Sequence, residues 1–182
     1  MDKVTESKIS IILQGCVHRT IARLKHDVTH RPFHEALLSK EILVGSAFER
    51  SFSTSFGQGP IEEISKIIAE STGAIVTRQK ESVVSIFKGA QDQINRIMSD
   101  LRAGNRSPNW ESEKTSVCAV DKGDVVVVRV ISDLHVIRDG KEMYFSIKTV
   151  KPNLDQIEIA KKNMLQLIAA NPRNETYLGR YY

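Results

Sequence analysis

The sequence predicts an α/β domain in which a mixed sheet is flanked by helices and preceded by a helical N-terminal region. Three observations support this fold class. Apolar residues recur at helical spacing up to Ser71, residues 116–150 are rich in Val, Ile and aromatic side chains, and another helical pattern separates that segment from a short strand-like C-terminus. A helix between two strands of one sheet forms a crossover connection, which is right-handed.

The length of the chain favours a single domain. With 182 residues it is long enough for one substantial core and short for two. We therefore expect one domain over residues 1–182, with a helical region at 1–58 and an α-β-hairpin-α-β core at 59–182. The sequence ends inside the last strand-like segment, so we expect that this core could continue in a longer native chain. A formal charge of +4 permits a phosphate-bearing partner without requiring one.

Three helices are expected before the sheet. Apolar positions at helical spacing predict amphipathic helices over Thr5–Val28 and Phe33–Phe52, and the run SFSTSFGQGP is expected to break the second one. Pro60 suits the first turn of a third helix, Pro60–Ser71, whose isoleucines predict a buried stripe.

The remaining elements follow from composition and periodicity. Residues 74–87 are interpreted as a short strand pair or extended arm, 90–104 as a helix and 105–115 as a linker. A set of sheet strands is expected at 116–150, a helix at 153–170 and a last strand at 175–182.

A β-hairpin is the clearest local signal. Asp-Gly at positions 139–140, between alternating apolar runs, is typical of a two-residue turn. Such a turn pairs residue 138 with residue 141, and stepping outward places Asp133 opposite Ser146. Because side chains alternate along a strand, Asp133, Ser146 and Lys148 are expected to share a polar face with His135 and Tyr144, while the opposite face is core.

The hairpin segment SDLHVIRDGKEMYFSIKTVKPN, with AFERSFSTSFGQG upstream, resembles the PD-(D/E)XK nuclease superfamily and, more narrowly, type II restriction endonucleases. The likeness covers the α-β-hairpin-α-β order from roughly Pro60 to Tyr182. It implies a restriction-endonuclease-like fold in which Asp133 binds the metal and Lys148 positions or activates the attacking water. It also implies Mg²⁺, since a hard cation prefers carboxylate oxygens and phosphodiester hydrolysis needs a Lewis acid.

Ser146 departs from this family pattern, which has a second acid two residues before the lysine. A hydroxyl is a weak, neutral Mg²⁺ ligand. Three interpretations stay open: the acid comes from elsewhere in the chain, the protein is an inactive relative, or the residue was substituted to trap a complex. Asp155 or Glu158 in the following helix, and Glu49 or Glu62 upstream, are candidate donors of the missing acid.

Two further acids are candidates for the metal site. The resemblance implies a glutamate from a helix ahead of the sheet, and Glu63, on the helix that precedes the sheet, is favoured among the upstream acids as this second metal ligand. Asp124 is a rival for the metal aspartate, since KGDVVVV also places an acid at the start of a strand. The hairpin geometry favours Asp133 over Asp124.

These features predict a site-specific endonuclease that hydrolyses phosphodiester bonds of double-stranded DNA with Mg²⁺, with Asp133, Ser146 and Lys148 in the catalytic site. The alternative is a catalytically inactive DNA-binding or assembly module with the same fold. Cutting both strands of a palindromic site predicts a two-fold homodimer, for which the first helix is the expected surface, and the resemblance implies a cognate methyltransferase. The sequence has no export signal, no apolar run near about 18 residues and no metal spacing around its two cysteines, which predicts a cytoplasmic protein without a membrane span.

Overall fold

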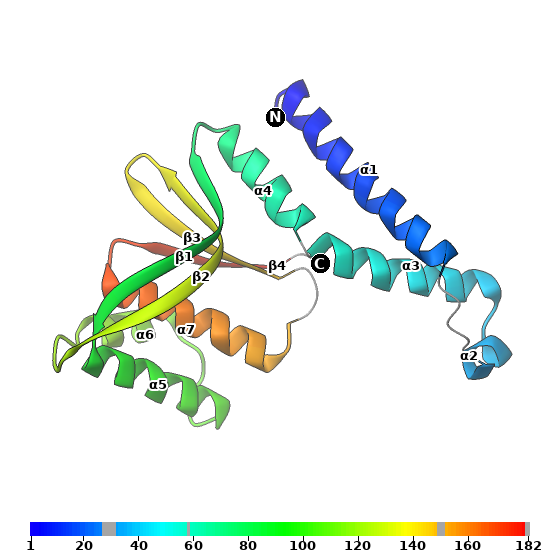
Figure 1. Ribbon diagram of the computed structural model, residues 1–182. Coiled ribbons are helices and arrows are strands. Elements are labelled where there is room, and N and C mark those ends of the chain that lie inside the picture. Colours follow the sequence, from blue (N-terminus) through cyan, green and yellow to red (C-terminus); the bar gives the residue numbers. More distant parts are fainter. Residues whose placement is uncertain (27–31, 58, 149–151, 181–182) are drawn as a thin grey trace.

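The computed structural model describes residues 1–26, 32–57, 59–148 and 152–180. It is a four-stranded mixed sheet flanked by helices, with a helical arm at the N-terminus, which confirms the predicted fold class (Figure 1). The elements in chain order are α1 (Lys3–Lys25), α2 (Pro32–Leu37), α3 (Lys40–Gly57), α4 (Pro60–Glu70), β1 (Ile75–Phe87), α5 (Lys88–Arg102), α6 (Trp110–Cys118), β2 (Val125–Arg138), β3 (Lys141–Lys148), α7 (Leu154–Ala170) and β4 (Glu175–Arg180). No helix in the described ranges is long and apolar enough to cross a membrane.

The sheet has the strand order β1-β2-β3-β4 and opens like a fork. β1 and β2 pair in antiparallel fashion from Ile75–Ile137 to Phe87–Val125, with no pair between Gln79 and Asp133. β2 and β3 pair only from Arg138–Lys141 to Leu134–Phe145. On its other edge β3 pairs with β4 in parallel from Met143 to Lys148, so its last three residues pair with β4 alone. The sheet therefore divides into a β1–β2 branch and a β3–β4 branch, which Figure 1 shows pointing in different directions.

α7 fixes the angle of this fork. The main core joins β1, α5, α6 and α7 through Ile86, Ala90, Ile94, Ile97, Met98, Val117 and Leu165. A smaller cluster, Val130, Tyr144 and Leu167, joins β2, β3 and α7. Each fully buried Ile or Leu stabilises the fold by about 1.5–3 kcal/mol. Since α7 packs against both branches, their separation is a property of the core.

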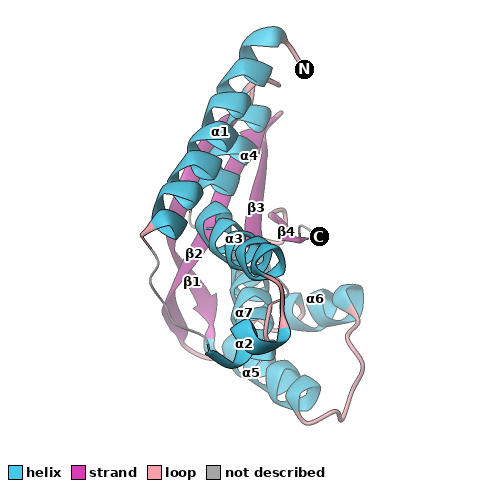
Figure 2. Ribbon diagram, turned by 90° about the vertical axis from the view of Figure 1, so that its right-hand side faces the viewer, coloured by secondary structure: helices cyan, strands magenta, loops and turns pink. Residues whose placement is uncertain are grey.

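The N-terminal helices form an arm with little core of its own. α1 contacts α3 and α4, and α4 contacts β1, so α4 connects the arm to the sheet (Figure 2). The buried residues of α1 are Thr5, Cys16 and Thr20, and α2 and α3 have none. Much of the apolar surface of the arm is therefore exposed in a single copy of the chain.

The sequence-based helix boundaries are correct for α4 and α7 but wrong for the helix predicted over Phe33–Phe52. The structure divides this segment at Ser39, whose hydroxyl accepts the N–H of Ile42 at 3.5 Å and so begins α3. α3 then continues through the predicted break to Gly57. Within this serine-rich run the Ser55 hydroxyl donates to the Ser51 carbonyl at 2.6 Å, a bond that a serine can make inside a helix. The predicted end of the first helix at Val28 lies outside the described residues.

Residues 105–118 also differ from the prediction of a linker followed by a strand, because they contain α6. Asn109 caps this helix: its side chain accepts the N–H of Ser112 at 3.0 Å, and Glu113 accepts the N–H of Asn109 at 3.1 Å. Upstream, β1 is one strand of 13 residues, which replaces the predicted strand pair or extended arm.

The predicted division of the hairpin into a polar face and a core face is wrong. His135 and Tyr144 are 6% and 7% exposed, and Leu134 and Val136 on the alternate positions are 3% and 5% exposed. Both α4 and α7 contact β2, so the hairpin is covered on both faces. The predicted hairpin register is confirmed, with Arg138 opposite Lys141 and His135 opposite Tyr144.

Candidate active site

Asp133 lies at the point where the sheet divides. It is the first residue of β2 beyond the last β2–β3 pair, Leu134–Phe145. Its Oδ2 accepts the backbone N–H of Ile147 at 2.5 Å and the Ser146 hydroxyl at 3.4 Å, so the side chain connects the two branches. Lys148 Nζ lies 3.7 Å from the same oxygen. The structure thus brings together the three hairpin residues that the sequence placed in a catalytic site.

A pocket of about 420 Å³ opens beside these three residues. It is lined by Arg129, Ile131 and Asp133 of β2, Ser146 and Lys148 of β3, and Gln156, Ile159, Ala160 and Asn163 of α7. The side chains of Asp133 and Lys148 are 22% and 27% exposed, which leaves both reachable from solvent while limiting their freedom. One carboxylate, two cationic side chains (Lys148 and Arg129) and several neutral oxygens therefore line the same space.

The glutamates of α4 are engaged with β1. Glu63 bonds to Arg78 Nη1 at 2.5 Å, and Glu62 accepts from Arg78 at 3.4 Å and from Gln79 Nε2 at 2.7 Å. Glu62 is 8% exposed. Neither residue lines the pocket beside Asp133, so the structure does not bring the expected second metal ligand, Glu63, to that pocket.

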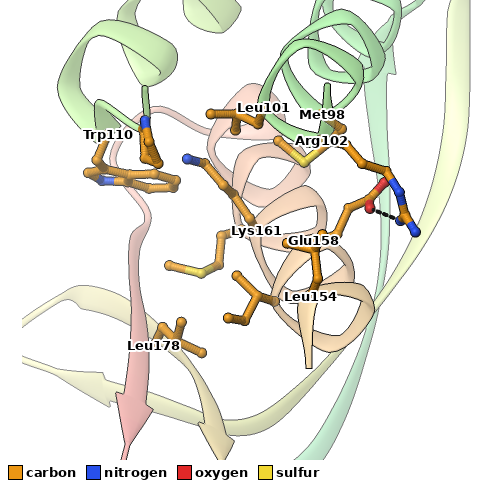
Figure 3. A pocket seen from close by; sticks show the side chains of 11 residues that line it. Met98, Leu101, Arg102, Trp110, Leu154, Glu158, Lys161 and Leu178 are labelled. Atoms are coloured by element: carbon orange, nitrogen blue, oxygen red, sulfur yellow. Dashed lines mark hydrogen bonds and ion pairs between the residues drawn. The ribbon is translucent and has the colours of Figure 1, made fainter. Parts of the chain in front are cut away.

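The acids of α7 face away from Asp133. Arg102 of α5 pairs with Asp155 at 2.9 Å and with Glu158 at 2.5 Å. Glu158 and Arg102 line a different, largely apolar pocket of about 400 Å³ between α5 and α7, beside Trp110 (Figure 3). The helix instead turns Gln156 and Asn163 toward Asp133. The following helix therefore supplies amides to the pocket, where the sequence interpretation considered carboxylates.

Asp124 and Glu49, the remaining candidate acids, are separated from the hairpin site. Asp124 precedes β2 at the far end of that strand, nine positions from Asp133, a path of about 30 Å along an extended strand. Its backbone carbonyl accepts the N–H of Lys88 at the start of α5. Glu49 accepts the hydroxyl of Ser53 within α3. The geometry favours Asp133 as the aspartate beside Lys148.

His135 and Tyr144 belong to a buried hydrogen-bond network. Their rings stack at 4.5 Å, and both side chains bond to Glu142 Oε2, Tyr144 at 2.7 Å and His135 at 3.0 Å. The hydrogen bond from Tyr144, followed by that from His135, lowers the pKa of Glu142 below its usual value. Burial, followed by the hydrogen bond to Glu142, raises the pKa of Tyr144. The network stabilises the hairpin behind Asp133.

Arg129, Gln156 and Asn163 line the pocket but were not singled out from the sequence. Arg129 is four residues before Asp133 on the same strand, and because side chains alternate between the two faces of a strand, this even spacing could have predicted that both lie on one face. Gln156 and Asn163 are seven residues apart on α7, which places them on one side of a helix. Their relation to Asp133 depends on the angle of the fork, which the sequence does not reveal.

The donor set fits a hard divalent cation such as Mg²⁺. Asp133 offers a carboxylate, Ser146 a hydroxyl and Asn163 an amide oxygen, all of them oxygen donors. Mg²⁺ is commonly held by one or two carboxylates together with waters and substrate phosphates. Among the described residues no group of three or more His, Cys, Asp or Glu side chains forms a metal cluster, so any such ion would depend on Asp133.

The four-stranded mixed sheet flanked by helices is consistent with a restriction-endonuclease-like fold. Sequence comparison gives the family: the model of the HinfI type II restriction endonucleases matches residues 1–179, and the chain belongs to this family.

Curated relatives agree with this assignment. The type II restriction enzyme HgiCII of Herpetosiphon aurantiacus is 27% identical over 206 residues, which cover all of this chain and 74% of the relative. HgiEI of the same organism is 24% identical, covering 87% of this chain and 59% of its own length. The type II restriction enzyme MjaII of Methanocaldococcus jannaschii is also 24% identical, covering 82% of this chain and 45% of its own length. No solved structure matches the chain at a comparable level of significance.

Proposed function

We propose that this chain hydrolyses phosphodiester bonds of double-stranded DNA at specific sites, with Mg²⁺ bound at Asp133. The observation that carries the proposal is the position of Lys148 Nζ, 3.7 Å from Asp133 Oδ2 in a pocket at the fork of the sheet. Membership of the restriction endonuclease family supports DNA as the substrate. Glu63 bonds to Arg78, so the proposal rests on Asp133 as the metal-binding carboxylate.

The hairpin residues have distinct roles in this reaction. The Ile147 N–H holds one oxygen of Asp133, which leaves the carboxylate oriented toward the pocket. Bound Mg²⁺ would supply Lewis-acid chemistry and charge for the scissile phosphate. Lys148 donates a hydrogen bond to the attacking water and offsets the negative charge that develops on the phosphoryl oxygens. Arg129, which lines the pocket and pairs with Glu81 at 3.1 Å, would contact the DNA backbone.

Ser146 determines how strongly the site holds its metal. Its hydroxyl lies 3.4 Å from Asp133 and contributes a neutral oxygen where the family pattern has a carboxylate. With one negative charge from the protein instead of two, the metal is expected to bind weakly and to depend on the phosphate of the substrate for further ligands.

We also propose that two copies associate through the N-terminal arm. Phe33, Leu37 and Ile42 on this arm are 71%, 67% and 55% exposed, and a pocket of about 740 Å³ lies between α1 and α3. A stable protein interface covers about 800 Å² on each partner, so an arm with this much open apolar surface is a suitable site. Lys25 and Glu41, of opposite charge, both line that pocket, so each could pair with the other residue on a second copy.

The cellular setting follows from the proposed activity. An enzyme that cuts duplex DNA at short sites also endangers the DNA of its own cell. We therefore include in the proposal a cognate methyltransferase that protects those sites, and a cytoplasmic location where both proteins meet DNA.

Plasmid cleavage in Mg²⁺ by three proteins tests the proposal: the chain as given, Ser146→Glu and Lys148→Ala. We expect the given chain to cut slowly, Ser146→Glu to cut faster and Lys148→Ala to be inactive. Cleavage only by Ser146→Glu would show that the given chain is an inactivated nuclease. If none of the three cuts while all bind DNA, the chain is a binding module and the proposal is wrong.

A further inference from the structure

Gln79 has an unusual backbone conformation in the middle of a long strand. Its φ is +47°, and Asp139 in the hairpin turn, with φ +52°, is the other non-glycine residue with positive φ among those described. Side chains with a Cβ rarely adopt the left-handed region, and strands require the extended region. A turn explains Asp139, whereas β1 continues on both sides of Gln79. This conformation is unfavourable and is kept in place by its surroundings.

The kink at Gln79 lies directly across from Asp133. Pairing between β1 and β2 is recorded at every position from Ile75–Ile137 to Phe87–Val125, except at the position where Gln79 would face Asp133. Asp133 is also just beyond the last β2–β3 pair. It therefore stands at an interruption of the sheet on both sides, and its carboxylate bonds to the backbone N–H of Ile147 on the other branch.

The kink brings the side chain of Gln79 to α4. Its Nε2 donates to Glu62 Oε1 at 2.7 Å, and Glu62 is a buried residue of α4. The adjacent Arg78 bonds to Glu62 and Glu63 of the same helix. Consecutive residues of an extended strand point to opposite faces, so the kink is what allows both Arg78 and Gln79 to reach α4.

We propose that Gln79 is a positioning residue: its left-handed backbone keeps the β1–β2 pairing open at Asp133, so that the carboxylate can lie between the two branches of the sheet and bind a divalent cation in the pocket. The inference rests on the proposed function, because it concerns the Mg²⁺ site. It predicts that the backbone conformation at residue 79 matters more than the amide. Residues that tolerate positive φ should preserve the site, and β-branched residues should close it.

The test compares Gln79→Gly with Gln79→Val in the full chain. Mg²⁺ affinity is taken from the rise of the unfolding midpoint with Mg²⁺ concentration. Gln79→Gly should bind Mg²⁺ as the wild type does. Gln79→Val should bind about tenfold more weakly, the factor expected when the competent conformation falls to about a tenth of the population. Both variants lose the hydrogen bond to the buried Glu62, so the unfolding midpoint without Mg²⁺ should fall in both, and the comparison between them isolates the backbone conformation.

Hydrogen exchange provides a readout that is independent of metal binding. Exchange across residues 131–135 should be slower in Gln79→Val than in the wild type, because the pairing closes, and unchanged in Gln79→Gly. Asp139→Ala is the matched control: it strains the other left-handed residue and should lower the midpoint without changing Mg²⁺ affinity.

Different failures identify different errors. Full Mg²⁺ affinity in Gln79→Val, or a loss in Gln79→Gly, would overturn the positioning role while leaving the proposed function intact. A wild type that shows no response to Mg²⁺ would contradict the proposed function itself, and unchanged exchange in Gln79→Val would then reject the backbone argument separately.

Discussion

Replacing Ser146 with glutamate is the most informative single change, because it restores the acid that the family pattern has at this position. The Ser146 hydroxyl is 3.4 Å from Asp133 Oδ2, so the new carboxylate would lie about 4 Å from an existing one. Two like charges at that distance repel by about 1 kcal/mol in bulk water and about 4 kcal/mol near a protein surface. Since Asp133 is 22% exposed, a cost between these limits is expected.

The effect of the added carboxylate on stability changes sign when a divalent cation binds. Without Mg²⁺, the unfolding midpoint of Ser146→Glu should fall, by about 2–4 °C for each kcal/mol. With Mg²⁺, both carboxylates are attracted to the ion, and the midpoint of the variant should rise more steeply than that of the wild type. The assay is thermal unfolding at increasing Mg²⁺, with Ser146→Gln as a neutral control of similar size. An equal Mg²⁺ response in all three proteins would refute the assignment of the metal to Asp133.

Three further predictions concern stability and assembly. Lys161→Met should lower the free energy of unfolding by about 3–5 kcal/mol, because it leaves the fully buried Glu113 without the ammonium that lies 2.5 Å away. Adding Glu113→Gln should restore the calorimetric midpoint, and a failure to do so would argue against this pairing. The hydrogen bond from Tyr144 lowers the pKa of Glu142 in the folded state, so its stabilising effect is present above the unfolded pKa of about 4.3 and is lost as pH falls further. Glu142→Gln should therefore flatten the fall in midpoint below about pH 5, and an unchanged pH profile would argue against it. Leu37→Lys should shift the chain toward monomer in analytical ultracentrifugation, with an unfolding midpoint equal to that of the wild type only at concentrations where both proteins are monomeric. A wild type that is monomeric at all concentrations would exclude the arm as an interface.

Local signals were enough to predict the hairpin and the residues that it brings together. Asp139-Gly140 determines the turn, the turn determines the register, and the register places Asp133 beside Ser146. Each step involves residues close in sequence, so no knowledge of the rest of the fold was needed. The limits of α4 and α7 were predictable for the same reason, since Pro60 and Asn153 are strong helix-start signals.

Features that depend on distant contacts were not predictable. α6 begins at Asn109 with a capping pattern that was interpreted as a linker, and the burial of Val117 against α5 and α7 is what makes it a helix. Likewise, Asp155 and Glu158 are in the helix that was expected to donate an acid, but their pairing with Arg102 depends on how α5 packs. The left-handed backbone at Gln79 had no sequence signal, because glutamine carries no preference for it.

The central claim, that Asp133 binds the metal for cleavage of duplex DNA, is tested most directly by comparing the wild-type chain with Asp133→Asn. Asparagine keeps the size and hydrogen-bonding oxygen of the side chain and removes its charge. The measurement is the rate of plasmid linearisation as Mg²⁺ is added and then removed with a chelator. We predict that the wild type cuts in a Mg²⁺-dependent manner and that Asp133→Asn does not cut, although it binds the same DNA. Cleavage by Asp133→Asn at the wild-type rate, or wild-type cleavage that persists after chelation, would contradict the account.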